Sequence, residues 1–260
     1  MSAPPAQPAA SVAAGSPALL SVVKVMPGVA QITLCSPKRR NAFSREMVAA
    51  IRQCLNQALA LGDCHTVVFR SESEDFSTGF DVGGLDQETD ESLRERFREI
   101  EALLVAVYTA PFRTVALARG RTWGAAADLV VSCDARWVIG EAEFRFPGAR
   151  FGLVLGSRRL AARLGRDRAR QLLFSGQALG TAAAISDGLV HRAFQSEADA
   201  LAALGQPPVM GKHTLLQVWA ATSAGEEDLL RDDRRALELS MTGSLKQRLL
   251  DYVQAQQSRR

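Results

Sequence analysis

The sequence has few of the residues that hold metals or build disulfide frameworks. Its 260 residues include three histidines and four cysteines, and the cysteines lie at irregular intervals with no Cys-x-x-Cys pair. Zinc sites and thioredoxin-like motifs need paired cysteines, and disulfide scaffolds need a dense set of them. We therefore expect no metal site, and we expect the reduced thiols of a cytoplasmic protein.

Long hydrophobic runs and an excess of charge are also missing. No stretch approaches the roughly 18 consecutive apolar residues of a transmembrane helix, so we expect no membrane span. Residues 1–17 are rich in Ala and Pro but lack Lys and Arg, which argues against a secretory or mitochondrial signal and predicts a disordered tail. With 31 basic and 28 acidic residues, the chain does not indicate a nucleic-acid partner.

Apolar residues make up 47% of the chain, enough for a substantial core. Short β-rich runs at 19–25 and 29–34 are split by Met-Pro-Gly and predict a hairpin. We expect further strands at 65–69, 114–118 and 136–139, and helices after an N-cap at Ser44, at 90–108 and at 124–133. Strands that alternate with helices are typical of a parallel α/β sheet.

The pattern changes after about residue 157, where the strand signal fades. Helices are expected at 160–174, 181–188, 213–221 and 226–256. The chain is therefore predicted to have an α/β core at 18–200 and a helical region at 201–260, with the disordered tail at 1–17.

Four segments, taken in order, resemble the crotonase (enoyl-CoA hydratase/isomerase) superfamily. The turn at 38–44 (KRRNAFS) resembles the family's N-A-L/F-S turn, and the loop at 76–82 (FSTGFDV) resembles its F-x-x-G-x-D loop. The segment at 120–134 (GRTWGAAADLVVSCD) resembles G-x-x-x-G-G-G-x-E-L-x-x-x-C-D, and 146–190 resembles the stretch that leads into the helical part. Each motif alone recurs by chance, but their order and spacing together are specific. The resemblance implies a crotonase-like ββα spiral core with a C-terminal helical region.

By this resemblance the substrate is an acyl-coenzyme A thioester, with no separate cofactor. Chemistry in the family passes through an enolate whose oxygen needs preorganised donors, and the match assigns them to the backbone N–H groups of Phe80 and Ala125. Gly79 would let the backbone approach the ligand, and a helix beginning after Gly124 would add partial positive charge. The other positions that match the family's substrate site are Lys38, Arg39, Arg40, Ala42, Asp81 and Gly148.

The basic turn at 38–40 has two interpretations. It is either a solvated surface turn or a contact for the 3′-phosphate or pyrophosphate of coenzyme A, since guanidinium groups pair well with phosphate. The family places the coenzyme near this turn, which favours the phosphate contact.

The acid–base positions depart from the family pattern. Hydratases of the family use two glutamates around the reacting water, but this chain has Asp128 at the first position and Gly148 at the second. Certain isomerases and hydrolases place an aspartate eight residues further on, where this chain has Gly156. We therefore predict that water addition is impaired and that Asp128 alone moves the proton. Alternatively, Asp128 only stabilises the start of its helix. Glu141 and Glu143 are interpreted as solvated.

A second basic stretch follows these positions and comprises Arg145, Arg150, Arg158 and Arg159. Its commoner interpretation is a solvated rim, and its alternative is recognition of an acidic acyl group.

Three functions fit the sequence. The first is an enoyl-CoA hydratase/isomerase-like lyase or isomerase that acts through Asp128. The second is an acyl-CoA-binding homologue without catalysis, and the third and weakest is thioester hydrolysis, for which we identify no base. The family also implies a homotrimer or a dimer of trimers. The apolar residues expected to support it are Trp219, Leu229, Leu230, Leu249, Leu250, Tyr252 and Val253.

Overall fold

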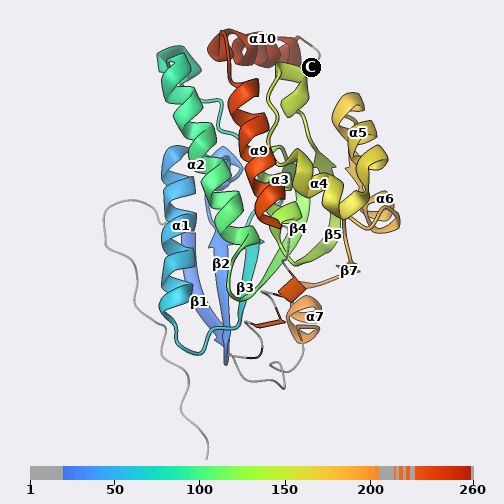
Figure 1. Cartoon of the computed structure of the whole chain (residues 1–260). Coiled ribbons are helices and arrows are strands. Elements are labelled where there is room, and N and C mark those ends of the chain that lie inside the picture. The colour runs from blue at the N-terminus through green and yellow to red at the C-terminus, as the bar shows by residue number, and fades with distance from the viewer. Residues whose placement is uncertain (1–19, 205–213, 215–216, 219–220, 223–225, 259–260) are drawn as a thin grey trace, which may run out of the picture.

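The computed structural model describes residues 20–204, 214, 217–218, 221–222 and 226–258 (Figure 1). The predicted tail at 1–17 and most of the predicted helix at 213–221, with Trp219, lie outside the described residues. The strands are β1 (Leu20–Met26), β2 (Val29–Leu34), β3 (Thr66–Ser71), β4 (Arg113–Trp123), β5 (Ala135–Arg145), β6 (Leu179–Gly180) and β7 (Arg192–Phe194). The α-helices are α1 (Arg45–Ala60), α2 (Asp90–Tyr108), α3 (Ala125–Ser132), α4 (Ser157–Leu164), α5 (Arg166–Ser175), α6 (Thr181–Ser186), α7 (Glu197–Ala202), α9 (Glu226–Ser240) and α10 (Leu245–Gln257). The short 3₁₀ helices are η1 (Pro37–Arg39), η2 (Leu85–Gln87) and η3 (Gly148–Phe151).

The described strands form one sheet in the order β1-β2-β3-β4-β5-β6, with β7 also pairing with β5. β1 and β2 form the predicted antiparallel hairpin, and β2, β3, β4 and β5 then pair in parallel. Because parallel strands point the same way, the segments that follow β3, β4 and β5 all begin at one edge of the sheet. The predicted substrate-site motifs at 76–82 and 124–134 are two of these segments.

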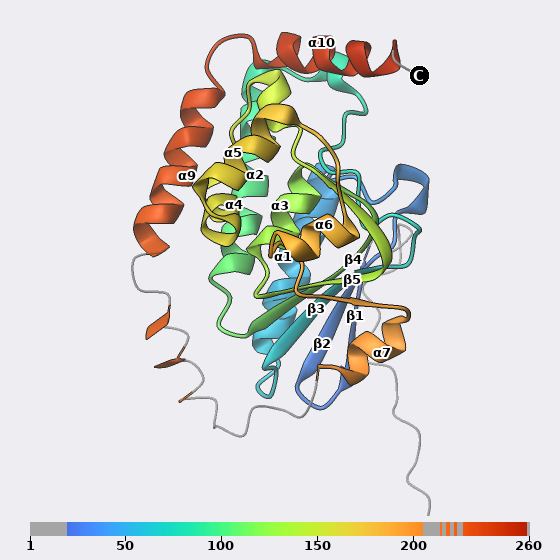
Figure 2. The same ribbon diagram turned by 90° about the vertical axis from the view of Figure 1, so that its right-hand side faces the viewer.

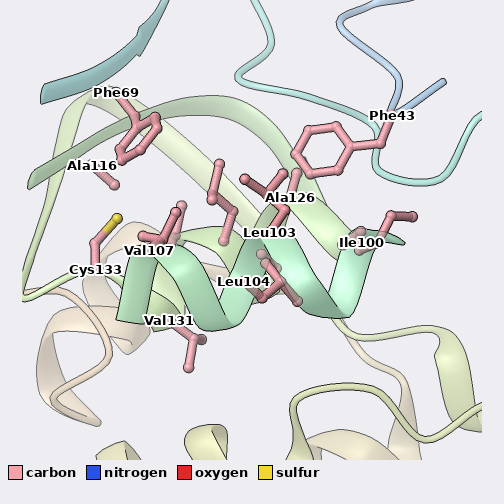
Figure 3. Close-up of a cluster of buried hydrophobic side chains, with 14 of the residues drawn as sticks. Phe43, Phe69, Ile100, Leu103, Leu104, Val107, Ala116, Ala126, Val131 and Cys133 are labelled. Carbon is pink, nitrogen blue, oxygen red and sulfur yellow. The ribbon is translucent and has the colours of Figure 1, made fainter. Parts of the chain in front are cut away.

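Side chains of the parallel strands alternate between two apolar layers, as a period of two requires. In β3, Val67 and Phe69 face the larger core, whereas Val68 faces a smaller layer that includes residues of α7. Figure 2 shows α7 on the side of the sheet opposite α1 and α2. Helix α2 fills the middle of the larger core with Ile100, Leu103, Leu104 and Val107 (Figure 3).

The C-terminal helices extend the molecule beyond this edge of the sheet. Helix α9 packs against α4, and α10 contacts both α2 and η3, crossing the end of the molecule (Figures 1 and 2). Leu249 of α10 was expected to offer surface for self-association. It is instead buried in the core of its own chain, so that expectation is wrong for this residue.

Two predicted helices are each divided in two. The predicted helix at 160–174 is α4 and α5, which meet at Gly165 with a φ of +77°. The predicted helix at 226–256 is α9 and α10, joined by a turn in which Gly243 has a φ of +73°. Left-handed backbone of this kind, which glycine tolerates, ends a helix. Strand β4 is longer than predicted, because it continues through a bulge near Gly120.

Candidate active site

The turn at 38–44 and the loop at 76–82 are joined by backbone hydrogen bonds. Phe43 N–H donates to Gly79 O at 2.7 Å, and Asp81 N–H donates to Phe43 O at 3.3 Å. The buried side-chain amide of Asn41 donates to Ser71 Oγ at 2.8 Å and to Phe76 O at 3.0 Å. Two motifs that are separate in the sequence therefore form one unit at the edge of the sheet.

Gly79 brings this unit against the start of α3. Its φ is +82°, and a Cβ atom added to it would lie 2.3 Å from Trp123 O and 3.3 Å from Ala125 N. The first distance is shorter than any real carbon–oxygen contact, and the φ alone favours glycine. Only glycine therefore permits the backbone at 79–80 to lie this close to Ala125.

The N–H groups of Phe80 and Ala125 have no hydrogen-bond acceptor among the described residues. The pairing of Phe43 with Gly79 O and Asp81 N–H leaves the Phe80 N–H on the opposite side of the loop, because successive groups alternate in an extended chain. Ala125 is the first residue of α3, and the first N–H groups of a helix have no partner within it. The structure thus places two unused donors next to each other.

Arg96 of α2 holds the Phe80 side chain and the next peptide. Its guanidinium lies 4.0 Å from the centre of the Phe80 ring, and its Nη2 donates to Asp81 O at 2.7 Å. The Phe80 ring also stacks on Phe97, with 4.5 Å between ring centres. Because Arg96 is buried, these contacts are expected to keep the loop at 79–81 in one conformation.

The basic turn lies at the surface beside this loop. Lys38, Arg39 and Arg40 are exposed, and Ala42 is buried beneath them. Arg39 Nη1 lies 2.8 Å from Asp81 Oδ2, so two of the predicted substrate-binding residues form an ion pair with each other. The Arg39 side chain is 65% exposed, so its ion pair with Asp81 is weak and another anion can take the place of the Asp81 carboxylate.

Asp128 is buried in α3, three residues after Ala125 and hence on the same side of the helix. No described residue donates a hydrogen bond to its carboxyl group; Ser132 Oγ bonds only its backbone O. Burial raises the pKa of Asp128 well above its usual range; the nearby Arg159 opposes this rise, and Asp233 and Glu101 add to it. A carboxyl group in such surroundings is suited to proton transfer near neutral pH.

Arg159 connects Asp128 with two further carboxylates. Its Nη1 and Nη2 donate to the two oxygens of Glu101 at 2.9 and 2.6 Å, and its Nε lies 3.7 Å from Asp233 Oδ2. Asp233 also accepts the backbone N–H groups of Arg158 and Arg159 at 2.7 and 3.2 Å, at the start of α4. The exposed fractions of Glu101, Asp128, Arg159 and Asp233 are 2%, 6%, 0% and 1%. We call these four residues the Arg159 cluster.

The solvated-rim interpretation is wrong for Arg159, which is fully buried. It was expected to be solvated because it follows another arginine in a basic run, and charged side chains are buried only when paired. Its partners, Glu101 and Asp233, lie 58 and 74 residues away in the sequence. Neither partner was predicted. The sequence does indicate that Glu101 is buried, because its position among the apolar residues of the helix places this acid on the core-facing side of α2.

Gly148 and Gly156 leave no carboxylate in the other two acid positions. A Cβ atom at Gly148 would lie 2.9 Å from Leu153 O, so even alanine would require the backbone to shift. A Cβ atom at Gly156 would lie 3.0 Å from Asp128 Oδ1, and its φ is +63°. The local backbone therefore favours glycine at both positions. Gly156, which precedes α4, also lies close enough to the Asp128 carboxyl group to limit the space for a ligand beside it.

The remaining predicted residues lie around the outside of the site. Glu143 accepts a hydrogen bond from Trp123 Nε1 at 3.0 Å and pairs with Arg145 at 2.9 Å, whereas Glu141 is exposed. Arg150 lines a cavity of about 610 Å³ between η3 and α10, to which neither Asp128 nor Phe80 contributes. Within the described residues, no group of three His, Cys, Asp or Glu side chains is arranged to hold a metal ion. None of the described helices is long and apolar enough to cross a bilayer.

Similarity to known proteins covers most of the chain. The family model described as "Enoyl-CoA hydratase/isomerase" matches residues 24–206. The chain is 31% identical over 167 residues to "Probable enoyl-CoA hydratase echA6" of Mycobacterium bovis, covering 63% of this chain and 66% of that protein. It is 26% identical over 186 residues to "Enoyl-CoA hydratase domain-containing protein 3, mitochondrial" of Danio rerio, covering 70% and 64%. The matches span slightly less than two thirds of these relatives' own length.

A solved structure extends the likeness to the fold. The crystal structure of a "putative enoyl-CoA hydratase/isomerase" from Bordetella parapertussis superposes with a TM-score of 0.83 at 31% sequence identity. The superposition covers 90% of this chain and 98% of that one. The likeness in fold therefore extends over most of the chain.

Proposed function

Because the chain belongs to the enoyl-CoA hydratase/isomerase family, we propose that it binds an acyl-coenzyme A thioester and stabilises an enolate at the N–H groups of Phe80 and Ala125. The observation that carries this proposal is the close approach of Gly79 to Ala125, which joins two donors that no described residue uses. Fixed backbone donors suit a developing oxyanion because they need no reorganisation during the reaction. The N-terminus of α3 adds partial positive charge at the same point.

Asp128 is the proposed catalytic carboxyl group of a lyase or isomerase. Its burial and its lack of a hydrogen-bond donor support this role, since a carboxylate that only stabilised the start of α3 would bond the free N–H groups there. Its position three residues after Ala125 places both on one side of the helix, which is the side that a bound thioester would contact.

The phosphates of coenzyme A are proposed to bind at Lys38, Arg39 and Arg40. The turn is joined to the loop that carries Phe80, so a ligand spanning both would meet cations at its phosphate end and backbone donors at its thioester end. Binding of a phosphate to Arg39 would replace its ion pair with Asp81.

A second candidate is a non-catalytic acyl-CoA-binding protein. Gly148 favours it, because the position lacks a carboxyl group and its backbone resists a side chain. Such a protein would keep the donors at Phe80 and Ala125 and would bind the thioester without moving a proton.

Turnover and binding measured together separate these functions. We would follow hydration of crotonyl-CoA, isomerisation of a 3-enoyl-CoA and binding of butyryl-CoA, for the wild type and for Asp128→Asn. The matched control is Asp232→Asn, since the Asp232 side chain is 46% exposed in α9. An enzyme acting through Asp128 loses ~10²–10⁴-fold in turnover with the first variant only and keeps its binding. Binding without turnover indicates the non-catalytic protein, and absence of binding overturns the proposal.

The assembly and compartment are also proposals. We propose that the protein lies in the cytoplasm and forms a homotrimer or a dimer of trimers. The exposed apolar side chains of Phe174 and Leu239, 81% and 64% exposed, support the self-association. Light scattering that shows a 28.0 kDa monomer at micromolar concentration would refute the assembly.

A further inference from the structure

We infer that the Arg159 cluster stores one proton on Asp128 at neutral pH, so that Asp128 meets the substrate as an acid and not as a base. The inference rests on the proposed function, because it concerns the same carboxyl group, and it narrows what that group does. It follows from how the donors and charges of the cluster are distributed among three carboxyl groups.

The hydrogen-bond donors of the cluster are divided unequally. Glu101 receives two from the Arg159 guanidinium, and Asp233 receives two from backbone N–H groups at the start of α4. Asp128 receives none from any described residue. Donors stabilise the ionised form of a carboxyl group. Burial raises the pKa of Asp233 as well, but its two backbone donors oppose that rise, whereas no hydrogen bond opposes the rise at Asp128, so Asp128 is the group that takes a proton.

The charges lead to the same assignment. Helix α3 carries Asp128 and packs against α2 and α4, which supply Glu101 and Arg159, while α9 supplies Asp233. Among the described residues, these are the charged groups that act on Asp128. With all three carboxyl groups ionised, one guanidinium would face three negative charges in a buried space, which is costly. One proton on Asp128 reduces that imbalance, and the Nη hydrogen bonds that Arg159 makes within the cluster both go to Glu101.

A protonated Asp128 can donate the proton in the last step of a reaction, but it cannot accept the proton whose removal would begin one. Its O–H bond breaks, the proton passes to Cα of an enolate, the enolate electron pair forms the C–H bond, and the thioester carbonyl is restored. The Asp128 carboxylate then regains a proton from water. Decarboxylation of a 2-carboxyacyl thioester supplies such an enolate without a base: the bond between Cα and the carboxylate breaks, its electron pair enters the enolate, and CO2 leaves.

The test is an infrared titration of the protein with ¹³C-labelled aspartate side chains. We expect a protonated-carboxyl band near pH 7 in the wild type that is absent in Asp128→Asn and unchanged in the exposed control Asp232→Asn. In Glu101→Gln and, independently, in Asp233→Asn, one negative neighbour is removed, so the midpoint for loss of the band moves to lower pH. A residue that merely supports the fold would not move this midpoint.

Absence of the band near pH 7 in the wild type would overturn the inference, as would a band that persists in Asp128→Asn and disappears in Asp233→Asn. A midpoint that does not move in either neighbour variant would remove Glu101 and Asp233 from the account. Turnover measured on the same samples keeps the two proposals apart. The band without acyl-CoA binding refutes the proposed function alone, whereas turnover through Asp128 without the band refutes this inference alone.

Discussion

The loop at Gly79 and the Arg159 cluster both meet the first turn of α3, yet different forces hold them. The loop is fixed by backbone hydrogen bonds and by the space that only glycine leaves. The cluster is fixed by charged side chains from four helices. Backbone geometry depends on a few glycines in a short motif, whereas a buried charge cluster depends on residues far apart in the sequence. The first can therefore be anticipated from short sequence motifs, and the second cannot.

The largest effect should come from removing the one cation of the cluster. Arg159→Met leaves the buried carboxyl groups of Glu101 and Asp233 without their shared cation, which should lower the free energy of unfolding by about 3–5 kcal/mol near pH 7. Arg158→Met is the matched control, since its side chain is 58% exposed and, among the described residues, forms an ion pair with Asp232 alone, a contact worth about 0–1 kcal/mol.

The loss in Arg159→Met should depend on pH with a defined sign. Burial raises the folded-state pKa of Asp128 and of Asp233, and removing Arg159 raises both further. The folded state then binds more protons than the unfolded state above the ordinary carboxyl range, so stability falls as the pH rises through that window. Urea denaturation near pH 5 and pH 7 should therefore show a smaller loss at pH 5. An equal loss at both would contradict the charge account.

Hydration of crotonyl-CoA should be slow, since the family's hydratases use two carboxyl groups and we propose Asp128 as the single one here. We expect the wild type to be ~10²–10⁴-fold slower than a two-glutamate hydratase assayed beside it. Gly148→Glu should not restore the rate, because its Cβ atom would meet Leu153 O at 2.9 Å. An ordinary hydratase rate in the wild type would show that another group, such as Glu143, replaces the missing acid.

Gly79→Ala should damage the loop while leaving the cluster intact. The left-handed φ and the 2.3 Å approach to Trp123 O predict a loss of about 2–4 kcal/mol in unfolding free energy, with weakened butyryl-CoA binding. In Gly62→Ala, the control, the added methyl meets no described atom within 4 Å, and neither quantity should change by more than about 0.5 kcal/mol. Full binding by Gly79→Ala would separate the thioester site from this loop.

The smallest effect should come from the basic turn. Arg40→Glu should weaken coenzyme A binding by about tenfold at low salt and by less at high salt, because exposed charges are screened. Arg39→Glu should weaken binding more, since the new carboxylate would also face Asp81. Titration calorimetry at two salt concentrations measures both. Unchanged affinity in both variants would move the phosphate site elsewhere.

Much of the fold could be predicted from local pattern. The hairpin, the Ser44 N-cap and the helix at 90–108 are confirmed, and the crotonase-like α/β fold is confirmed by the solved structure it resembles. Helix breaks at Gly165 and Gly243 were missed because the apolar spacing continues across both, and a single glycine is also tolerated inside a helix.

The candidate site was less predictable, and the reason is distance along the chain. The assignment of the two donors to Phe80 and Ala125 could be made from two glycine motifs, because the residues within each motif determine its backbone conformation. The burial of Arg159 could not, since nothing near it in the sequence shows that Glu101 and Asp233 will meet it. The ion pair between Arg39 and Asp81 was missed for the same reason, as it joins two separate motifs.

If the backbone N–H groups of Phe80 and Ala125 hold the thioester oxygen, the carbonyl group of a bound ligand reports this directly. The measurement is the infrared stretching frequency of butyryl-CoA labelled with ¹³C at the thioester carbonyl, free and bound, with binding established by calorimetry. Two hydrogen bonds polarise the carbonyl group, so we predict a lower frequency in the bound state and a smaller decrease in Gly79→Ala. A bound ligand whose carbonyl frequency equals that of the free ligand would contradict the account.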